Sequence, residues 1–229
     1  MRLLDKIDLE DRVAIDVGAH SGNWTLNLAR RVGPTGVVLA YEALPHYGRA
    51  LSISIRLQRA RNVRVRNFAV GDCEKTISLR WRSNTNEMLT GRTHVEPGVQ
   101  PSASVIEVPM VSLDRDLETC GVDPSDVGFV KIDVEGAELE VLRGACNLLS
   151  VGRPIVYLEA EPPWLERLGH TVEDVFDAMA AHGYRPHLSS EAGPTTTDVA
   201  SYLAQYVDRR EYNNVLFLPA KTSGSDGLR

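Results

Sequence analysis

Short β-branched segments alternate with stretches of helical spacing from residue 13 to residue 159. Between these segments, apolar residues recur three to four positions apart, as in a helix that is buried on one side. Strands that alternate with helices need crossover connections, and this predicts an α/β fold with a doubly wound, mainly parallel sheet. The predicted strands are residues 13–17, 37–41, 63–70, 127–134 and 155–159.

The C-terminal part of the chain has a different pattern. We expect a helix over residues 172–181 and strands over residues 184–188 and 213–218. A polar insertion at about residues 191–212 separates the two strands and shows no clear crossover helix. The two late strands therefore predict an antiparallel hairpin.

A second polar insertion lies at about residues 83–104 and is rich in Gly, Pro, Thr and Asn. Apparent strands at residues 77–81 and 105–110 flank it, so we expect a loop carried on a β-ribbon. A loop of this length without its own structure is either a functional lid or disordered, and the sequence leaves both open.

Length and hydrophobic content set the number of domains. The chain has 229 residues, of which 43% are hydrophobic, so it is long enough to bury one substantial core. We expect residues 1–221 to form a single domain that carries both insertions. Residues 222–229 are expected to form a flexible tail.

Charge and apolar content exclude several partners. The formal net charge of −6 repels polyanions, so no nucleic acid is expected to bind. No segment approaches the ~18 apolar residues of a membrane helix, and residues 1–6 lack the apolar stretch of a signal peptide. Three widely spaced cysteines, Cys73, Cys120 and Cys146, form no CxxC pattern. We therefore expect a soluble protein without a membrane partner, located in the reducing cytoplasm.

A turn with two glycines follows the first predicted strand, at residues 16–22. In an open parallel sheet this first strand-to-helix turn is the usual ligand site. Gly18 and Gly22 let the backbone approach a ligand without a β-carbon, and the next helix presents free amides. Asn23 and Thr25 add polar side chains there. The alternative is an ordinary tight turn that only joins a strand to a helix.

The residues around this turn indicate which nucleoside binds. Glu42 ends the second predicted strand, where a carboxylate accepts the hydroxyls of a ribose. A dinucleotide site needs G-x-G-x-x-G, but this turn has only Gly18 and Gly22. Asp16, just before the turn, suits a ligand that carries an ammonium group, such as the methionine half of S-adenosylmethionine.

Four segments of the chain resemble those of FkbM-type methyltransferases, and the resemblance extends over about residues 13–217. It implies a Rossmann-like methyltransferase fold, with a mainly parallel seven-stranded sheet and a C-terminal antiparallel hairpin. It also implies methyl transfer to an oxygen, often a sugar or polyketide hydroxyl. The segments are DVGAHSGNWT at 16–25, YEALP at 41–45, NFAVGD at 67–72 and KIDVEGAE at 131–138.

The resemblance assigns roles to particular residues in the donor site. It places the donor's amino-acid half on the turn that contains His20, the ribose on Glu42 and the adenine near residues 67–70. The chain departs from the family in one place, because Ala43 and Leu44 separate Glu42 from the proline that commonly follows directly. The predicted contacts of the two halves of the donor are Gly18, Ala19, His20 and Gly22 on the turn and Asn67, Ala69 and Val70 at the adenine.

Acidic residues close the fourth and fifth predicted strands. Asp133 and Glu159 are expected at the cofactor side of the sheet, with Glu161 two residues further along. Converging carboxylates suit Mg²⁺, which would bind the acceptor and lower the pKa of its hydroxyl. Alternatively, Asp133 contacts only the donor and Glu159 caps a loop.

The candidates for taking the proton from the acceptor are Asp133 and Glu135, followed by His20 and His94. The alternative is that Glu135 only begins the next helix, and that each histidine is an ordinary surface residue.

The leading hypothesis is therefore an O-methyltransferase that uses S-adenosylmethionine and Mg²⁺ and acts on a hydroxyl of a carbohydrate or glycosylated metabolite. Two alternatives stay open, an NAD-linked oxidoreductase and a non-catalytic module of the same fold. A homodimer is also considered, with Trp164, Leu165 and residues 202–206 as the candidate face, although these side chains also suit an ordinary core.

Overall fold

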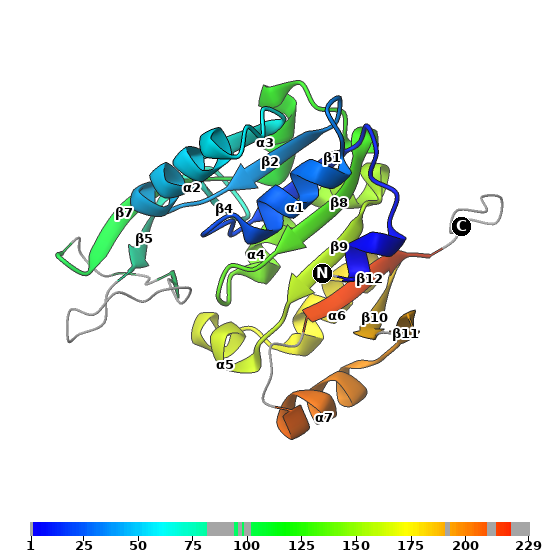
Figure 1. Ribbon diagram of the computed structural model, residues 1–229. Coiled ribbons are helices and arrows are strands. Elements are labelled where there is room, and N and C mark those ends of the chain that lie inside the picture. The colour runs from blue at the N-terminus through cyan, green and yellow to red at the C-terminus, as the bar shows by residue number, and fades with distance from the viewer. Residues whose placement is uncertain are drawn as a thin grey trace.

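The computed structural model describes residues 2–81, 94–95, 98, 102–190, 193–209 and 214–220. It shows a large twisted sheet with helices on both faces and a smaller sheet beside it (Figure 1). Parallel strands form most of the large sheet, and antiparallel strands form its C-terminal edge. The predicted α/β fold with a mainly parallel sheet is confirmed.

The large sheet has the strand order β11-β10-β12-β9-β8-β1-β2-β3. The first strand of the chain lies inside the sheet, because β1 pairs with β2 on one side and with β8 on the other. This reversal of strand order leaves a crevice beyond the carboxyl ends of the strands, where ligands bind in such sheets. The parallel strands are β1 (Val13–Val17), β2 (Val37–Tyr41), β3 (Val63–Arg66), β8 (Val127–Ile132) and β9 (Ile155–Glu159).

Alternate residues of β1 face opposite sides of the sheet. Ile15 and Val17 pack into the larger core cluster with helices α3 (Leu113–Cys120), α4 (Glu138–Arg143) and α6 (Val172–Ala181). Ala14 instead packs with Leu28 of α1 (Asn23–Arg31) on the other face. Helix α2 (Pro45–Leu57) covers the same face as α1, because its Leu51 packs on Ala40 of β2.

Local sequence signals set the ends of several helices. Ser112 caps α3 by accepting from Arg115 N, and Gly121 ends that helix in the left-handed conformation. Thr171 and Asp174 form a capping box at the start of α6. The remaining short elements are η1 (Arg2–Lys6), η2 (Pro124–Asp126), η3 (Leu148–Gly152), α5 (Pro162–Leu165) and η4 (Glu166–Leu168).

A smaller sheet of order β4-β7-β5-β6 lies at the carboxyl ends of the parallel strands (Figure 1). Its antiparallel pair β5–β7 is the expected β-ribbon. The predicted strand over residues 63–70 is wrong in one respect, because its second half leaves the large sheet as β4 and pairs with β7. The strands are β4 (Ala69–Val70), β5 (Lys75–Arg80), β6 (His94–Val95) and β7 (Val105–Val111).

The C-terminal strands differ from the expected simple hairpin. Strands β10 (Tyr184–Ser190) and β12 (Asn214–Pro219) are antiparallel neighbours, as predicted. The polar insertion between them contains a further strand, β11 (Gly193–Thr196), and helix α7 (Val199–Arg209). Strand β11 pairs with β10, so the large sheet has eight strands among the described residues, and not seven.

Part of the candidate dimer face lies in the core, because Leu165 and Tyr202 have no exposed surface. Most of the insertion at residues 83–104 and the tail at 222–229 lie outside the described residues. No helix in the described part of the chain is long and apolar enough to cross a membrane.

Candidate functional site

A cavity of about 520 Å³ lies beyond the carboxyl ends of β1, β2 and β8, at the point where strand order reverses. The turn after each of these strands forms one part of its wall. Helix α2 and the small sheet contribute apolar side chains on another side, including Tyr47, Ile77 and Met110. Of the residues predicted to hold the donor, the cavity is lined by Gly18, Ala19, His20, Asn23, Glu42, Ala69, Val70 and Asp133.

The turn after β1 is packed so closely that two of its positions need glycine. Gly18 has φ +81°, and a β-carbon there would lie 1.8 Å from the carbonyl oxygen of Asp133. Gly22 has φ +84°, and its β-carbon would lie 2.4 Å from the Leu51 side chain. The amides of Gly18 and Ala19 both donate to Tyr41 O, at 3.0 and 2.9 Å. The turn is thus fixed against β2 on one side and the loop after β8 on the other.

Glu42 lies at the cavity, as its predicted role with a ribose requires. Its Oε2 accepts a hydrogen bond from His20 N and its Oε1 accepts one from Leu44 N, both at 2.8 Å. Burial raises the pKa of Glu42, while these two backbone bonds act in the opposite direction. A carboxylate oxygen has room for more than one hydrogen bond, so each oxygen of Glu42 can also accept a bond from a ligand hydroxyl.

Asp16 lies beneath the cavity and does not line it. It has no exposed surface, and its Oδ2 accepts from Thr25 Oγ1 at 2.6 Å. Its Oδ1 lies 3.8 Å from Lys131 Nζ. The prediction that Asp16 meets an ammonium group of the ligand does not fit this position, because Lys131 already supplies the cation. Thr25 is also fully buried, so both residues lie in the floor of the site beneath the cavity.

Lys131 links the floor to a carboxylate on the cavity wall. Its Nζ lies 2.8 Å from Asp133 Oδ2, and the ring of Trp24 faces the same ammonium group at 5.9 Å. Burial lowers the pKa of Lys131, but the charges of Asp16 and Asp133 outweigh it and raise the pKa overall. Burial raises the pKa of Asp133, but the charge of Lys131 and the hydrogen bonds from Glu159 and Lys131 together outweigh it, so the pKa is lowered overall and Asp133 stays ionised.

Glu159 forms a hydrogen bond with Asp133. Burial, this bond and the charge of Asp133 together raise the pKa of Glu159 to about 10. Glu159 is therefore protonated at neutral pH and donates to the ionised Asp133. The two carboxyl groups share one proton, which removes the repulsion between them.

The predicted magnesium site does not fit this arrangement. Among the described residues, no group of three or more His, Cys, Asp or Glu side chains is placed to hold a metal ion. Asp133 is engaged by Lys131, and neither Glu159 nor Glu161 lines the cavity. The cation that pairs with Asp133 is the ammonium group of Lys131.

The candidates for the proton acceptor lie at different places. Asp133, Glu135 and His20 all line the cavity, whereas His94 belongs to β6 and its side chain lies outside the described residues. Burial lowers the pKa of His20, which keeps its ring neutral, and the ring packs 4.2 Å from that of Tyr47. Glu135 has φ +55° in the loop after β8.

Glu138 fixes the shape of that loop. Its Oε1 accepts hydrogen bonds from Val134 N at 3.1 Å and from Gly136 N at 3.2 Å. The side chain is buried, and burial raises its pKa to about 7. Glu135 thus lines the cavity, whereas the buried Glu138 holds the backbone of the same loop.

The predicted adenine region is only partly at the cavity. Ala69 and Val70 line it, but Asn67 packs its amide against Gly48 of α2. Phe68, which falls within the predicted range 67–70, also lies at the cavity wall. Lys131 was not among the predicted site residues, although a lone lysine between apolar strand residues signals that an opposite charge lies nearby.

Solved structures resemble this chain in fold at low sequence identity. The methyltransferase FkbM from Methylobacillus flagellatus has a TM-score of 0.57 and 16% identity, and the match covers 91% of this chain and 44% of that protein. The precorrin-6y C5,15-methyltransferase from Geobacter metallireducens gives 0.51 and 15%, over 96% and 86% of the two chains. Aeropyrum pernix fibrillarin, solved with natively bound S-adenosylmethionine, gives 0.51 and 14%, over 94% and 72%.

The fold is that of a Rossmann-like methyltransferase. Residues 16–186 match the model of the methyltransferase FkbM domain, which is more than half of the chain. The protein belongs to the FkbM methyltransferase family. It spans less than half the length of the Methylobacillus protein, and no curated protein matches its sequence.

Proposed function

We propose that this protein transfers a methyl group from S-adenosylmethionine to a hydroxyl group of a carbohydrate or glycosylated metabolite. The proposal rests on three features that meet at one cavity. A glycine turn lies in the middle, with Glu42 on one side of the turn and the ionised Asp133 on the other. Membership of the FkbM family favours methyl transfer over the NAD-linked alternative.

The donor site fits the expected ligand on structural grounds. Gly18 lines the cavity, and the absence of a β-carbon there lets the turn pack directly against the carbonyl of Asp133. Glu42 is held by two backbone amides and lies next to that turn. We assign the donor's amino-acid half to residues 18–20, with Asn23 beside them, and the ribose to Glu42. When bound, the donor supplies a methyl group on a positively charged sulfur.

Asp133 is the residue that we assign to the acceptor hydroxyl. It is ionised, lines the cavity and is fixed from both sides by Lys131 and Glu159. An immobile carboxylate accepts the hydrogen bond of the hydroxyl and orients its oxygen for in-line attack. As the oxygen–carbon bond forms and the carbon–sulfur bond breaks, the hydroxyl proton passes to Asp133.

Activity measurements test this proposal. The protein is incubated with methyl-labelled S-adenosylmethionine and a panel of methyl glycosides and oligosaccharides, with and without EDTA. We expect labelled O-methyl product, unchanged by EDTA, because the carboxylate of Asp133 is already paired with Lys131. Asp133→Asn should lower turnover by about 100-fold or more, in the range of general-base catalysis. Donor affinity without turnover on any acceptor would instead favour the non-catalytic module.

A further inference from the structure

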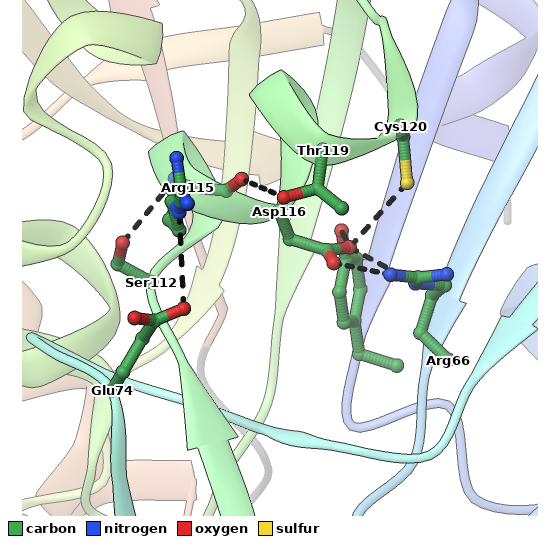
Figure 2. Close-up of polar contacts among 8 residues, drawn as sticks. Arg66, Glu74, Ser112, Arg115, Asp116, Thr119 and Cys120 are labelled. Atoms are coloured by element: carbon green, nitrogen blue, oxygen red, sulfur yellow. Dashed lines mark hydrogen bonds and ion pairs between the residues drawn. The ribbon is translucent and has the colours of Figure 1, made fainter.

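A buried carboxylate on α3 lies behind the cavity wall. Asp116 is only 4% exposed, and its Oδ2 accepts from Tyr41 Oη at 2.7 Å and from Arg66 Nε at 3.0 Å. Its Oδ1 accepts from Arg66 Nη2. Figure 2 shows the carboxylate facing the Arg66 guanidinium group. Asp116 thus joins α3 to β2 through Tyr41 and to β3 through Arg66.

Tyr41 connects this carboxylate to the donor turn. Tyr41 is among the residues that line the cavity, and its carbonyl oxygen accepts hydrogen bonds from the amides of both Gly18 and Ala19. The next residue is Glu42, whose amide donates to Arg66 O at 3.0 Å. The two residues that bond to Asp116 therefore also hold the backbone of the glycine turn and of the carboxylate assigned to the ribose.

Arg66 connects the same carboxylate to a second part of the cavity. The guanidinium carbon lies 5.2 Å from the centre of the Phe68 ring, in a cation–π contact. Phe68 lines the cavity beside Ala69 and Val70. A guanidinium group that is bound through two nitrogens has a fixed orientation. Asp116 therefore limits where the Phe68 ring lies.

Stability alone is a weak reason for this arrangement. A buried ion pair loses much of its attraction to the cost of desolvation, and apolar residues of similar size often serve the fold equally well. Both partners of Asp116, however, contact residues that line the cavity. We propose that Asp116 is a positioning residue for the nucleoside half of the donor and acts through Tyr41 and Arg66. This inference rests on the proposed donor site.

Binding measurements on the full chain test this inference. Asp116→Asn leaves one acceptor oxygen and places an amide NH₂ group against Arg66 or Tyr41. Calorimetry with S-adenosylhomocysteine and with 5′-methylthioadenosine should show about tenfold weaker binding of both, because both contain the nucleoside. The matched control is Asp114→Asn, which alters a carboxylate on the same helix that bonds Asn147 N and Leu148 N away from the cavity. It should leave both affinities within twofold of wild type.

A milder variant covers the case in which Asp116→Asn does not fold. Tyr41→Phe removes only the hydroxyl that reaches Asp116, and it should weaken both ligands by about threefold. If wild type binds S-adenosylhomocysteine and the folded Asp116 and Tyr41 variants bind it equally well, the positioning role is overturned while the donor site stands. If wild type binds neither ligand, the donor site itself is overturned, and the positioning role with it.

Discussion

Lys131 Nζ lies 2.8 Å from Asp133 Oδ2, in the loop that follows the strand carrying the lysine. Lys131 is also the register partner of Asp16 on β1, so one buried ammonium group joins the floor of the cavity to its wall. This contact explains two features of the site, the ionised state of Asp133 and the poor fit of a metal ion beside it.

Replacing Lys131 should destabilise the fold strongly. Lys131→Met leaves Asp16 and Asp133 without their cation, and breaking a buried ion pair costs about 3–5 kcal/mol. Urea unfolding at neutral pH measures the loss. The control is Lys75→Met, which removes an exposed pair with Asp72 and should cost about 0–1 kcal/mol. Equal losses in the two variants would contradict the central position given to Lys131.

The shared proton of Glu159 predicts a dependence of stability on pH. Its pKa is about 10 in the folded protein, well above the ordinary value of 4.5, so the folded state binds more protons between these values. The contribution of Glu159 to stability is fully present below the ordinary pKa and is lost as the pH rises toward 10. Glu159→Gln removes this dependence, because glutamine does not titrate.

The stability difference between wild type and Glu159→Gln should therefore shift in favour of the variant as the pH rises from 6 to 9. The slope is at most about 1.4 kcal/mol per pH unit for one proton. Urea unfolding at several pH values gives this slope. Glu166→Gln, at an exposed position, is the control and should show a constant difference from wild type. A constant difference for Glu159→Gln as well would mean that Glu159 and Asp133 do not share a proton.

Gly18 should tolerate no side chain. Gly18→Ala places a β-carbon against the carbonyl oxygen of Asp133, so the turn and the loop after β8 must move apart. We expect binding of S-adenosylhomocysteine to fall by about 100-fold or more. Gly33→Ala is the matched control, because Gly33 also has a positive φ, of +72°, but has room for a β-carbon. Both variants carry about 1–3 kcal/mol of backbone strain, and only Gly18→Ala should lose the ligand.

The alternation of strands and helices was enough to predict the parallel sheet, because each buried strand is a short β-branched run. It could not show where the strand over residues 63–70 breaks. That break depends on tertiary partners, since Arg66 bonds to Asp116 and the residues after Asn67 pair with β7. Helix α7 was missed although Val199, Tyr202, Leu203 and Tyr206 have helical spacing, because the polar residues before them resembled a loop.

The site was predicted in outline because glycines and strand-end acids have recognisable positions. Gly18, Glu42 and Asp133 do meet at one cavity. Asp16 does not line this cavity, since alternate residues of a strand point to opposite faces. Asp16 shares the α1 face with Ala14, where Thr25 and Lys131 surround it. Sequence spacing places a carboxylate near a turn but does not show which charged residue from another strand neutralises it.

A calorimetric titration of wild type and Glu42→Gln with S-adenosylhomocysteine tests the donor site most directly. We expect saturable binding to a single site in wild type. Binding to Glu42→Gln should be about 10- to 100-fold weaker, because a hydrogen bond to a charged group is worth about 1.5–3 kcal/mol. Absence of binding to wild type, or equal affinity of the two proteins, would contradict the assignment of this cavity to the methyl donor.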